Sequence, residues 1–341
     1  MTGRENYAKT IEFGGPDYVP CCIDVDLDWL YEKDAGKSEV ILELRSQVRD
    51  DILCAFEAAG TRMDLRADNG NTQWNDEWGT GWLDDGFGAK TVIHPLSGGY
   101  DLMDEYAFPD PFLKGRFDES DTLLVNRGDR YVRPSVWFTL FERMWMLRGF
   151  ENILIDPYLY EKEFAYLRDK IVDYDLAMID QWLDRGVDGI FISDDWGSQR
   201  DLLINPDDWR RLYRDCYKKL FERIRSRGKH VWMHLCGNVI SIIPDLLDLG
   251  LNVLNPVQPQ AMDLDFLGEN FGGNLCFYGG VDVQGTLVQG SVQEVKDSVK
   301  KLIDTFGSFN GGYIGGTSHS IMPETPLDNV MAMYETFLEY Q

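Results

Sequence analysis

The second half of the chain alternates short, β-branched apolar runs with longer amphipathic stretches, and this alternation constrains the fold more than any other feature. Five of the runs predict strands, and each is followed by a stretch that predicts a helix. The predicted strands span residues 187–195, 229–237, 252–258, 274–282 and 312–319. Strands that alternate with helices form a parallel sheet, because each helix returns the chain to the same edge.

The stretches between these runs carry the signals that start and stop helices. Pro206 and the acids after it suit the first turn of a helix that continues to about residue 227, where Gly228 ends it. The other predicted helices span residues 239–249, 264–270, 292–306 and 327–340. Each predicted strand is therefore joined to the next by a helix.

The first half is less regular but supplies the remaining units. It predicts strands over residues 19–26 and 131–138, helices over 38–59 and 160–185, and a strand with a glycine-rich hairpin over 69–97. The total approaches eight β/α units without a linker, so we expect one (β/α)8 TIM barrel over residues 1–341, with an N-terminal excursion at about 69–118. A doubly wound open sheet is the alternative, but no glycine-rich phosphate loop follows the first strand.

The charge of the chain excludes several classes of partner. It has 33 basic and 58 acidic side chains, which give a formal net charge of -25. Such a protein repels phosphate backbones and anionic membranes, so we expect no nucleic-acid or membrane partner. No apolar run reaches the roughly 18 residues of a membrane span. The polar first residues lack the apolar core of an export signal, so we expect a cytoplasmic protein whose six cysteines are thiols.

Polar residues end the predicted strands, where the active site of a parallel barrel lies. They are Asp24, Asp26, Asp194, Asp195, His234, Cys236, Asn255, Gln258, Asp282, Ser318 and His319. Together they indicate a functional barrel mouth. Adjacent strand residues point to opposite faces, so we expect only one of Asp194 and Asp195 to face the mouth, while a cap or a salt bridge is the alternative role of either.

His234 and Cys236 are two apart on one strand and therefore point to the same face. The strand separates them by about 6.6 Å, which an imidazole and a thiolate can close around one metal ion. A soft thiolate beside an imidazole favours zinc over magnesium or calcium. The alternative is a buried core cysteine beside a hydrogen-bonded histidine.

Besides the motif His234-Leu235-Cys236-Gly237-Asn238, several other segments of the chain are typical of one protein family. They are residues 194–199, 242–247, 254–259, 279–282 and 318–321. With these segments the chain resembles the uroporphyrinogen decarboxylase superfamily, and more specifically its cobalamin-dependent methyltransferases. The resemblance covers most of the chain and is densest from Gly186 onward.

This resemblance implies a zinc site of which His234 and Cys236 are two ligands. The thiol-methylating branch completes such a site with a later cysteine, and His319 stands at the matching position here. His319 is therefore expected as the third ligand or as a polar substrate contact. Cys276 is the rival third ligand, with Asp208 as a further candidate. For Cys276 core packing is the alternative, and for Asp208 stabilisation of a helix N-terminus.

One departure from the family bears on the substrate. True decarboxylases carry an arginine-rich N-terminal segment that clamps the carboxylates of a porphyrin. Here the corresponding segment, residues 21–26, contains Asp24 and Asp26 and no arginine. Extra carboxylates oppose a polyanionic tetrapyrrole, whereas arginines would pair with it. The sequence therefore argues against a porphyrinogen substrate.

The remaining site predictions concern catalysis and substrate contacts. Asp195 and His319 are the predicted catalytic residues. Substrate contacts are predicted for Asp24, Asp26, Trp78, Asp194, Gln258 and Asp282. Trp74, Trp78 and Trp82 lie on the excursion, where aromatic residues pack against the barrel or, alternatively, form the wall of a pocket for a planar substrate.

We therefore expect a zinc-dependent methyltransferase that exchanges a methyl group between a small molecule and a corrinoid. A corrinoid-binding histidine motif is absent from the sequence, so a separate corrinoid protein is the expected partner. The missing second family cysteine and the tryptophan-rich excursion favour O-demethylation of a methoxylated aromatic. Methylation of a thiol or of tetrahydrofolate is an alternative, as is a metal-free decarboxylase. A barrel that only binds a corrinoid or tetrapyrrole is less consistent with so many ionisable residues at the mouth.

Overall fold

The computed structural model describes residues 1–23, 30, 32–58, 63–68, 71–84 and 88–341. Its centre is a seven-stranded parallel sheet in the order β1-β6-β7-β8-β9-β10-β11. The strands are β1 (Ile52–Ala55), β6 (Tyr131–Val136), β7 (Gly189–Ser193), β8 (His230–His234), β9 (Val253–Asn255), β10 (Cys276–Tyr278) and β11 (Tyr313–Ile314).

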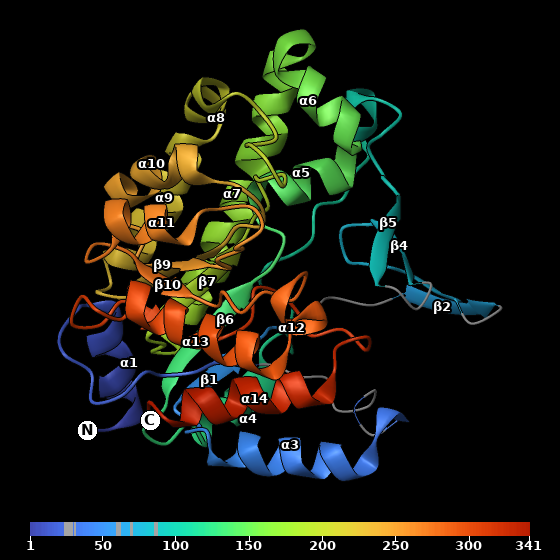
Figure 1. Ribbon diagram of the computed structural model, residues 1–341. Helices are drawn as coiled ribbons and strands as arrows, with labels where there is room; N and C mark the ends of the chain where they lie inside the picture. Colours follow the sequence, from blue (N-terminus) through green and yellow to red (C-terminus); the bar gives the residue numbers. More distant parts are fainter. Residues whose placement is uncertain (24–29, 31, 59–62, 69–70, 85–87) are drawn as a thin grey trace.

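The place of an eighth strand is taken by the segment around Cys21. Cys21 forms a parallel bridge with Gly315, directly after β11. With this bridge the curled sheet forms the predicted TIM barrel, and helices cover its outside (Figure 1). Of the predicted first strand, residues 24–26 lie outside the described residues, and Cys21 is its bridged residue.

The helices that follow the strands agree with the sequence in the second half, with two interruptions. The helices from β6 onward are α5 (Leu140–Arg148), α6 (Phe150–Leu159), α7 (Glu161–Asp184), α8 (Pro206–Leu212), α9 (Arg214–Arg225), α10 (Ile243–Leu249), α11 (Leu264–Phe271), α12 (Thr286–Gln289), α13 (Val292–Phe306) and α14 (Leu327–Leu338). The helix predicted after Asn205 breaks at Tyr213, whose ring packs 4.6 Å from that of Trp196. A 3-10 turn, η2 (Ile240–Ile242), precedes α10.

The prediction of a helix over residues 38–59 is wrong in its second part. The helix is α3 (Ala35–Gln47), and the chain is extended at Val48 before it enters β1. The four residues of β1, Ile-Leu-Cys-Ala, are all apolar, although only Leu53 and Ala55 are buried, while Ile52 and Cys54 line a cavity. A short apolar run without alternation fits a buried helix or strand equally well, so its periodicity could not distinguish them.

A second, antiparallel sheet projects from one side of the barrel (Figure 1). Its strands are β2 (Met63–Asp68), β3 (Asn71–Asn75), β4 (Gly81–Asp84) and β5 (Ala89–Ile93), in that order. Trp74 on β3 pairs with Trp82 on β4, and their rings stack 6.1 Å apart. The turn η1 (Tyr100–Asp104) and the helix α4 (Asp118–Val125) then lead back to β6.

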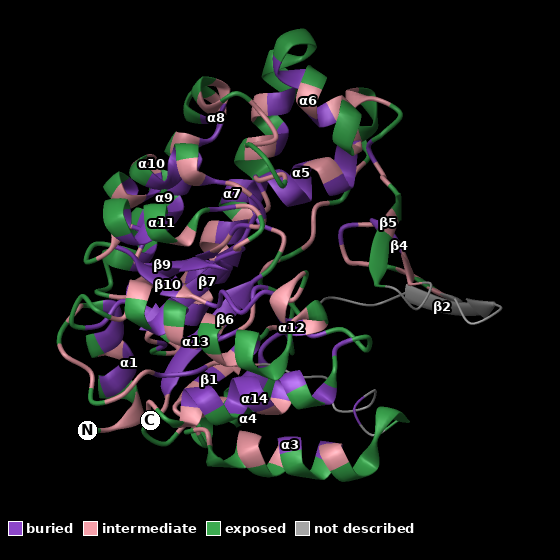
Figure 2. Ribbon diagram, viewed as in Figure 1, coloured by how far each residue is buried: buried purple, intermediate pink, exposed green. Residues whose placement is uncertain are grey.

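The core has two parts that together define where a ligand can enter. Apolar faces of the helices pack against the outside of the sheet, which is buried throughout the centre of the molecule (Figure 2). A smaller cluster fills the barrel interior, where Tyr7 and Ile11 of α1 (Gly3–Ile11) pack with Tyr131 and Trp232. Because α1 closes the amino ends of the strands, the carboxyl ends form the accessible mouth. None of the described helices has the length and apolar character needed to cross a lipid bilayer.

Candidate metal centre and substrate cavity

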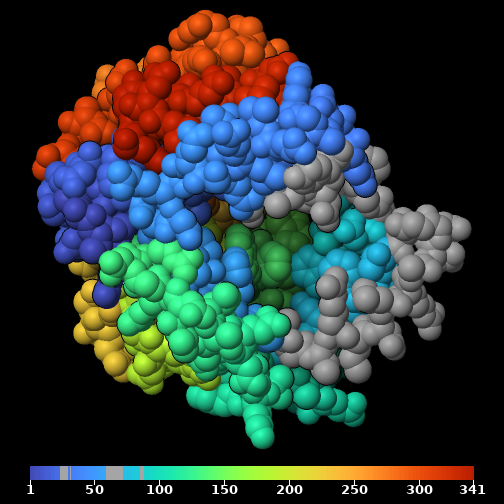
Figure 3. Space-filling view, turned by 90° about the horizontal axis from the view of Figure 1, so that it is seen from below, coloured from blue at the N-terminus to red at the C-terminus, as the bar shows by residue number. Residues whose placement is uncertain are grey.

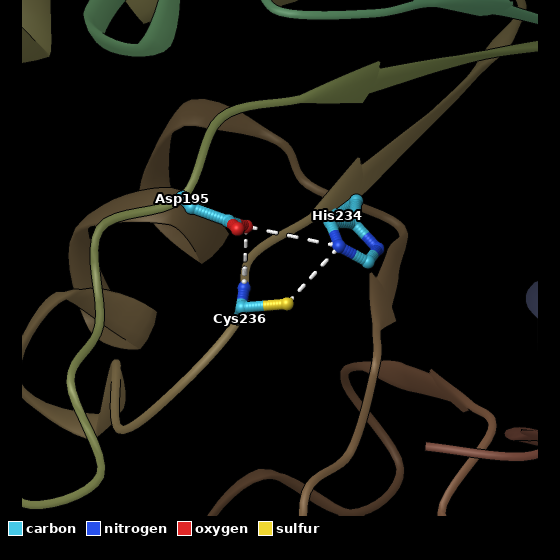
Figure 4. A group of neighbouring side chains, drawn as sticks. All are labelled: Asp195, His234 and Cys236. Carbon is cyan, nitrogen blue, oxygen red and sulfur yellow. Dashed lines mark hydrogen bonds and ion pairs between the residues drawn. The ribbon is translucent and has the colours of Figure 1, made fainter. Parts of the chain in front are cut away.

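Three potential metal ligands meet at the carboxyl ends of β7 and β8 (Figure 4). Their ligand atoms, one each from Asp195, His234 and Cys236, all lie within 4.8 Å of one another. Nε2 of His234 lies 3.2 Å from Sγ of Cys236 and 3.7 Å from Oδ1 of Asp195. Carboxylate, imidazole and thiolate are all zinc ligands, so the donor set fits a zinc ion.

The loops that carry these ligands pack backbone against backbone. The Gly197 amide donates to the Cys236 carbonyl at 3.0 Å, and the Asn238 amide donates to that of Ser198 at 2.7 Å. A side chain on Gly237, which has φ +81°, would collide with the backbone of Gly197. This contact explains why glycine follows both Asp-Asp-Trp and His-Leu-Cys in the sequence.

A hydrogen-bonded asparagine fixes the imidazole of His234. Nδ2 of Asn255 donates to the carbonyl of Tyr278 at 3.2 Å, so its Oδ1 faces Nδ1 of His234, 2.8 Å away. Nδ1 therefore carries the proton and Nε2 presents its lone pair toward Cys236 and Asp195. Burial lowers the pKa of His234, which keeps the ring neutral, as a metal ligand must be.

The thiol of Cys236 is protonated in the metal-free protein. Burial raises its pKa well above the usual value, and the carboxylate of Asp195 adds to the effect. The same carboxylate accepts the Cys236 amide at 2.9 Å, which holds the two residues together. A divalent cation between them would offset both negative charges and favour the thiolate.

Asp194 and Asp195 point to opposite sides, and the structure places Asp195 at the mouth. Asp194 is completely buried, and its carboxylate accepts the amides of Phe141 and Glu142 at 2.8 and 2.7 Å and the hydroxyl of Tyr217. It thus caps α5 from outside the helix. These contacts contradict the predicted role of Asp194 in substrate binding, because all of its hydrogen-bond partners among the described residues are buried in the core.

We expect Asp194→Ala to lower the free energy of unfolding by at least about 3 kcal/mol, because each buried donor left without an acceptor costs about 1–3 kcal/mol. Asp195→Ala is the matched neighbour, and its partly exposed side chain predicts a loss below about 1 kcal/mol. Urea unfolding measures both. Equal losses in the two variants would contradict the assignment of Asp194 to the core.

Asp194 also predicts a dependence of stability on pH. Burial raises its pKa from 3.8 to about 7. The folded state therefore holds this proton more tightly than the unfolded chain. Its contribution to stability is present below about pH 4 and is lost as the pH rises through about 7. Asp194→Asn does not titrate, so this part of the pH dependence should be absent from its unfolding curves.

The candidates for a further ligand lie apart from the three residues. His319 is exposed, and its ring centroid lies 6.5 Å from that of His234. Cys276 begins β10 in register with Val253 and Trp232, which places it two strands away and deeper in the barrel than His234. Asp208 binds Arg211 and Tyr158 at the start of α8. The structure therefore assigns Cys276 to the core and Asp208 to a helix end.

Two other predicted contacts have structural partners. Gln258 accepts the amide of Gly237 through Oε1 and so holds the loop of Cys236. Asp282 accepts from the side chain of Gln260 at 2.7 Å and from the Gln284 amide at 3.0 Å, before α12. Asp24 and Asp26 lie outside the described residues.

A buried carboxyl group that the sequence reasoning missed adjoins the metal centre. Oε2 of Glu142 accepts the hydroxyl of Ser193 at 2.9 Å, at the end of β7. Burial raises the pKa of Glu142 well above its usual value, and the charges of Asp195 and Asp194 raise it further. It was missed because α5, which carries it, was not predicted.

A cavity of about 1020 Å3 opens beside His234. Its walls include Trp137, Phe191 and Tyr278 from the barrel, and His319 at the mouth. It also borders α3, where the molecule is hollowed between the blue segment with α3 and the green segment with α4 (Figure 3).

The cavity wall contains arginines, although the N-terminal segment at residues 21–26 has none. Three arginines line the cavity, namely Arg45 from the last turn of α3, Arg49 from the segment after α3, and Arg133 from β6. They do not come from the N-terminal segment, where the family pattern would place them, so the motif comparison did not find them.

A smaller cavity of about 340 Å3 lies next to the first and shares Phe56 and Trp137 with it. Trp74, Trp78 and Trp82 all line it, together with Phe138. Trp78 is 4% exposed, and the guanidinium of Arg143 lies 4.8 Å from its ring. The excursion thus both packs against the barrel and contributes the wall of a pocket.

Comparisons with known proteins agree with this architecture. A family model described as uroporphyrinogen decarboxylase (URO-D) matches residues 138–340. Among solved structures, a methyltransferase from Methanosarcina mazei has a TM-score of 0.72 over 100% of this chain and 99% of its own, at 16% identity. That likeness shows the fold.

The curated relatives that are similar to the chain include a methyltransferase and uroporphyrinogen decarboxylases. It is 25% identical over 182 residues to the methylcobamide:CoM methyltransferase MtaA of Methanosarcina barkeri, which is 53% of this chain and 49% of that protein. It is 23% identical over 185 residues to the uroporphyrinogen decarboxylase of Christiangramia forsetii, or 51% and 48% of the two chains. The chain thus spans about half the length of the curated relatives it matches. Because the family model covers more than half of the sequence, this chain belongs to the uroporphyrinogen decarboxylase family.

Proposed function

We propose that the protein is a zinc-dependent methyltransferase, which moves a methyl group between a small molecule and a corrinoid carried by a separate protein. The observation that carries the proposal is the group of Asp195, His234 and Cys236 at the barrel mouth, beside a cavity large enough for a small substrate. A decarboxylase needs no thiolate-imidazole pair. The similarity to MtaA, a methylcobamide:CoM methyltransferase, supports the same reading.

The metal would be held by Asp195, His234 and Cys236, whose donor atoms are of the types that bind zinc. When bound, zinc supplies Lewis acidity that polarises an ether oxygen or lowers the pKa of a thiol. Asn255 keeps Nε2 of His234 aimed at the site, and Asp195 keeps the Cys236 loop in place. Such fixed geometry avoids reorganisation when the methyl group leaves.

The cavity supports a methoxylated aromatic as the methyl donor. Trp137 lies 5.8 Å from His234 between ring centroids, and Phe191 lies 6.1 Å from it, so an aromatic wall adjoins the metal centre. A planar substrate ring packs well against such walls. Loss of the methyl group leaves an oxygen anion, and we assign its protonation to His319, which is exposed and lines the cavity.

Asp195 and His319 are expected to differ in their effects on metal binding. Asp195→Asn removes a charged ligand. It should weaken zinc affinity by at least the roughly 10–100-fold that is typical when a residue supporting a metal ligand is lost. His319→Ala should leave the zinc affinity within about threefold of that of the unaltered protein. Competition with a chromogenic chelator measures both affinities. His319→Ala should instead slow turnover. Loss of zinc from His319→Ala, with Asp195→Asn unaffected, would make His319 the third ligand.

Decarboxylation of a polycarboxylate is a second candidate, favoured by the three arginines of the cavity and by the decarboxylase relatives. Methyl transfer to a thiol or to tetrahydrofolate uses the same proposed centre with a different acceptor. Metal analysis of the purified protein separates the first candidate from the second: about one zinc per chain supports methyl transfer, and a metal-free, active decarboxylase would exclude it.

A further inference from the structure

Arg133 places a positive charge inside the barrel. Its side chain projects from β6 into the main cavity, yet the residue is only 5% exposed. Nη2 donates to Sγ of Cys54 at 2.8 Å. Nε and Nη1 are buried and have no hydrogen-bond partner in the described part of the chain. Two nitrogens of this buried guanidinium therefore have unmet hydrogen-bonding capacity.

The charge of Arg133 also has no carboxylate counter-ion among the described residues, although the chain contains 58 acidic side chains. Among the described residues that line the same cavity, the one acid is Asp50, which is 78% exposed and pairs with Arg130. Burial of an unpaired charge costs several kcal/mol. The arrangement is explained if an anionic ligand supplies the missing charge.

Aromatic rings hold the guanidinium in a fixed position. It lies 4.3 Å from the ring of Phe191 and 5.3 Å from that of Trp232. Phe191 also contacts the imidazole of His234, with 6.1 Å between ring centroids. Arg133 and the metal centre are therefore separated by about one aromatic side chain within one cavity.

Two further observations support an anion at this place. Ser135 lies two residues beyond Arg133 on the same face of β6, and its buried Oγ also lacks a partner within the described residues. Arg45 and Arg49 line the outer part of the cavity. In a protein of net charge -25, a cavity lined by three arginines concentrates anions.

We infer that Arg133 binds a carboxylate of the substrate. A guanidinium donates charge-assisted hydrogen bonds to carboxylate oxygens, and the aromatic walls suit a flat ring that bears the carboxylate. If the proposed function holds, the opposite end of the same molecule presents its methyl group to Asp195, His234 and Cys236. The substrate class is then a methoxylated aromatic carboxylate.

The test compares 4-methoxybenzoate with its neutral analogue 4-methoxybenzamide by titration calorimetry on the zinc-loaded protein. The benzoate should bind at least about tenfold more tightly, because a hydrogen bond to a charged carboxylate is stronger than one to a neutral amide. Equal affinity of the two compounds for the unaltered protein would overturn the inference, and this comparison needs no variant to fold.

Variants then locate the effect. Arg133→Gln should reduce the preference for benzoate to within about twofold, and Arg133→Lys should retain part of it. Arg227→Gln removes the same charge from the exposed turn that follows α9 and should leave the preference unchanged. An undiminished preference in folded Arg133→Gln would place the carboxylate elsewhere, for example on the metal.

The binding result is independent of methyl transfer. Carboxylate binding that needs Arg133, without any demethylation, would leave this inference intact and refute the proposed function. Demethylation of the benzamide and the benzoate with equal efficiency would refute this inference and leave the proposed function intact.

Discussion

Replacing Cys236 by alanine is expected to remove zinc and methyl transfer together. The thiolate is the softest of the three proposed ligands, and without it the site retains only an imidazole and a carboxylate. We expect about one zinc per chain in the unaltered protein and almost none in Cys236→Ala. The rate should fall by about a thousandfold or more, because a Lewis acid contributes several kcal/mol of transition-state stabilisation.

Cys276→Ala is the matched control for this experiment. Cys276 is as buried as a core residue can be and lies below the level of His234 in the barrel. Its replacement should cost stability and leave the zinc content unchanged. Elemental analysis reports the metal, and circular dichroism reports the fold. Full zinc occupancy in folded Cys236→Ala would refute the metal centre, and loss of zinc from Cys276→Ala would bring Cys276 into the ligand set.

The sequence predicted the barrel because its second half contains strong local signals. For α13, predicted over 292–306, the bounds agree with the structure because Ser291 and Glu294 form a capping box at its start. The strands β7 to β11 lie within their predicted runs, which are long enough to be distinguished from loops. Residues two apart on a strand share a face, so the meeting of His234 and Cys236 also followed from the sequence.

The rest depended on contacts between distant segments. The location of Arg133 in the cavity depends on the pairing of β6 with β1 and β7, which a single strand does not specify. Similarly, the sequence left open which of Asp194 and Asp195 faces the mouth. The answer comes from α5, whose free amides meet Asp194 from the outside of the barrel. That helix lacks a side-chain cap of its own, and it was not predicted.

The arginines of the cavity allow a substrate with one carboxylate, but they still disfavour a porphyrinogen. The acidic segment around Asp24 and Asp26, which contains no arginine, argued against a porphyrinogen substrate. The structure instead offers one buried cation, Arg133, and two cations nearer the surface. One carboxylate can be compensated fully at Arg133. A porphyrinogen carries several, and each one left desolvated without a cation costs several kcal/mol.

The decisive assay therefore sets methyl transfer against decarboxylation in one preparation. When the protein is mixed with a reduced corrinoid protein and 4-methoxybenzoate, the cobalt absorption should shift from the reduced to the methylated corrinoid. The shift should require zinc, and Cys236→Ala should abolish it.

Uroporphyrinogen supplied without a corrinoid should not be consumed in the same preparation. The methyl ether is neutral at its reacting end, so it can approach the metal centre without desolvating a charge there, and its single carboxylate has a partner in Arg133. A porphyrinogen has no such division between a neutral reacting end and one charged end. The two reactions would use the same cavity. Turnover of uroporphyrinogen without zinc, retained in Cys236→Ala, would therefore contradict the proposal. It would show that the arginines serve decarboxylation and that the three ligands do not form a catalytic metal centre.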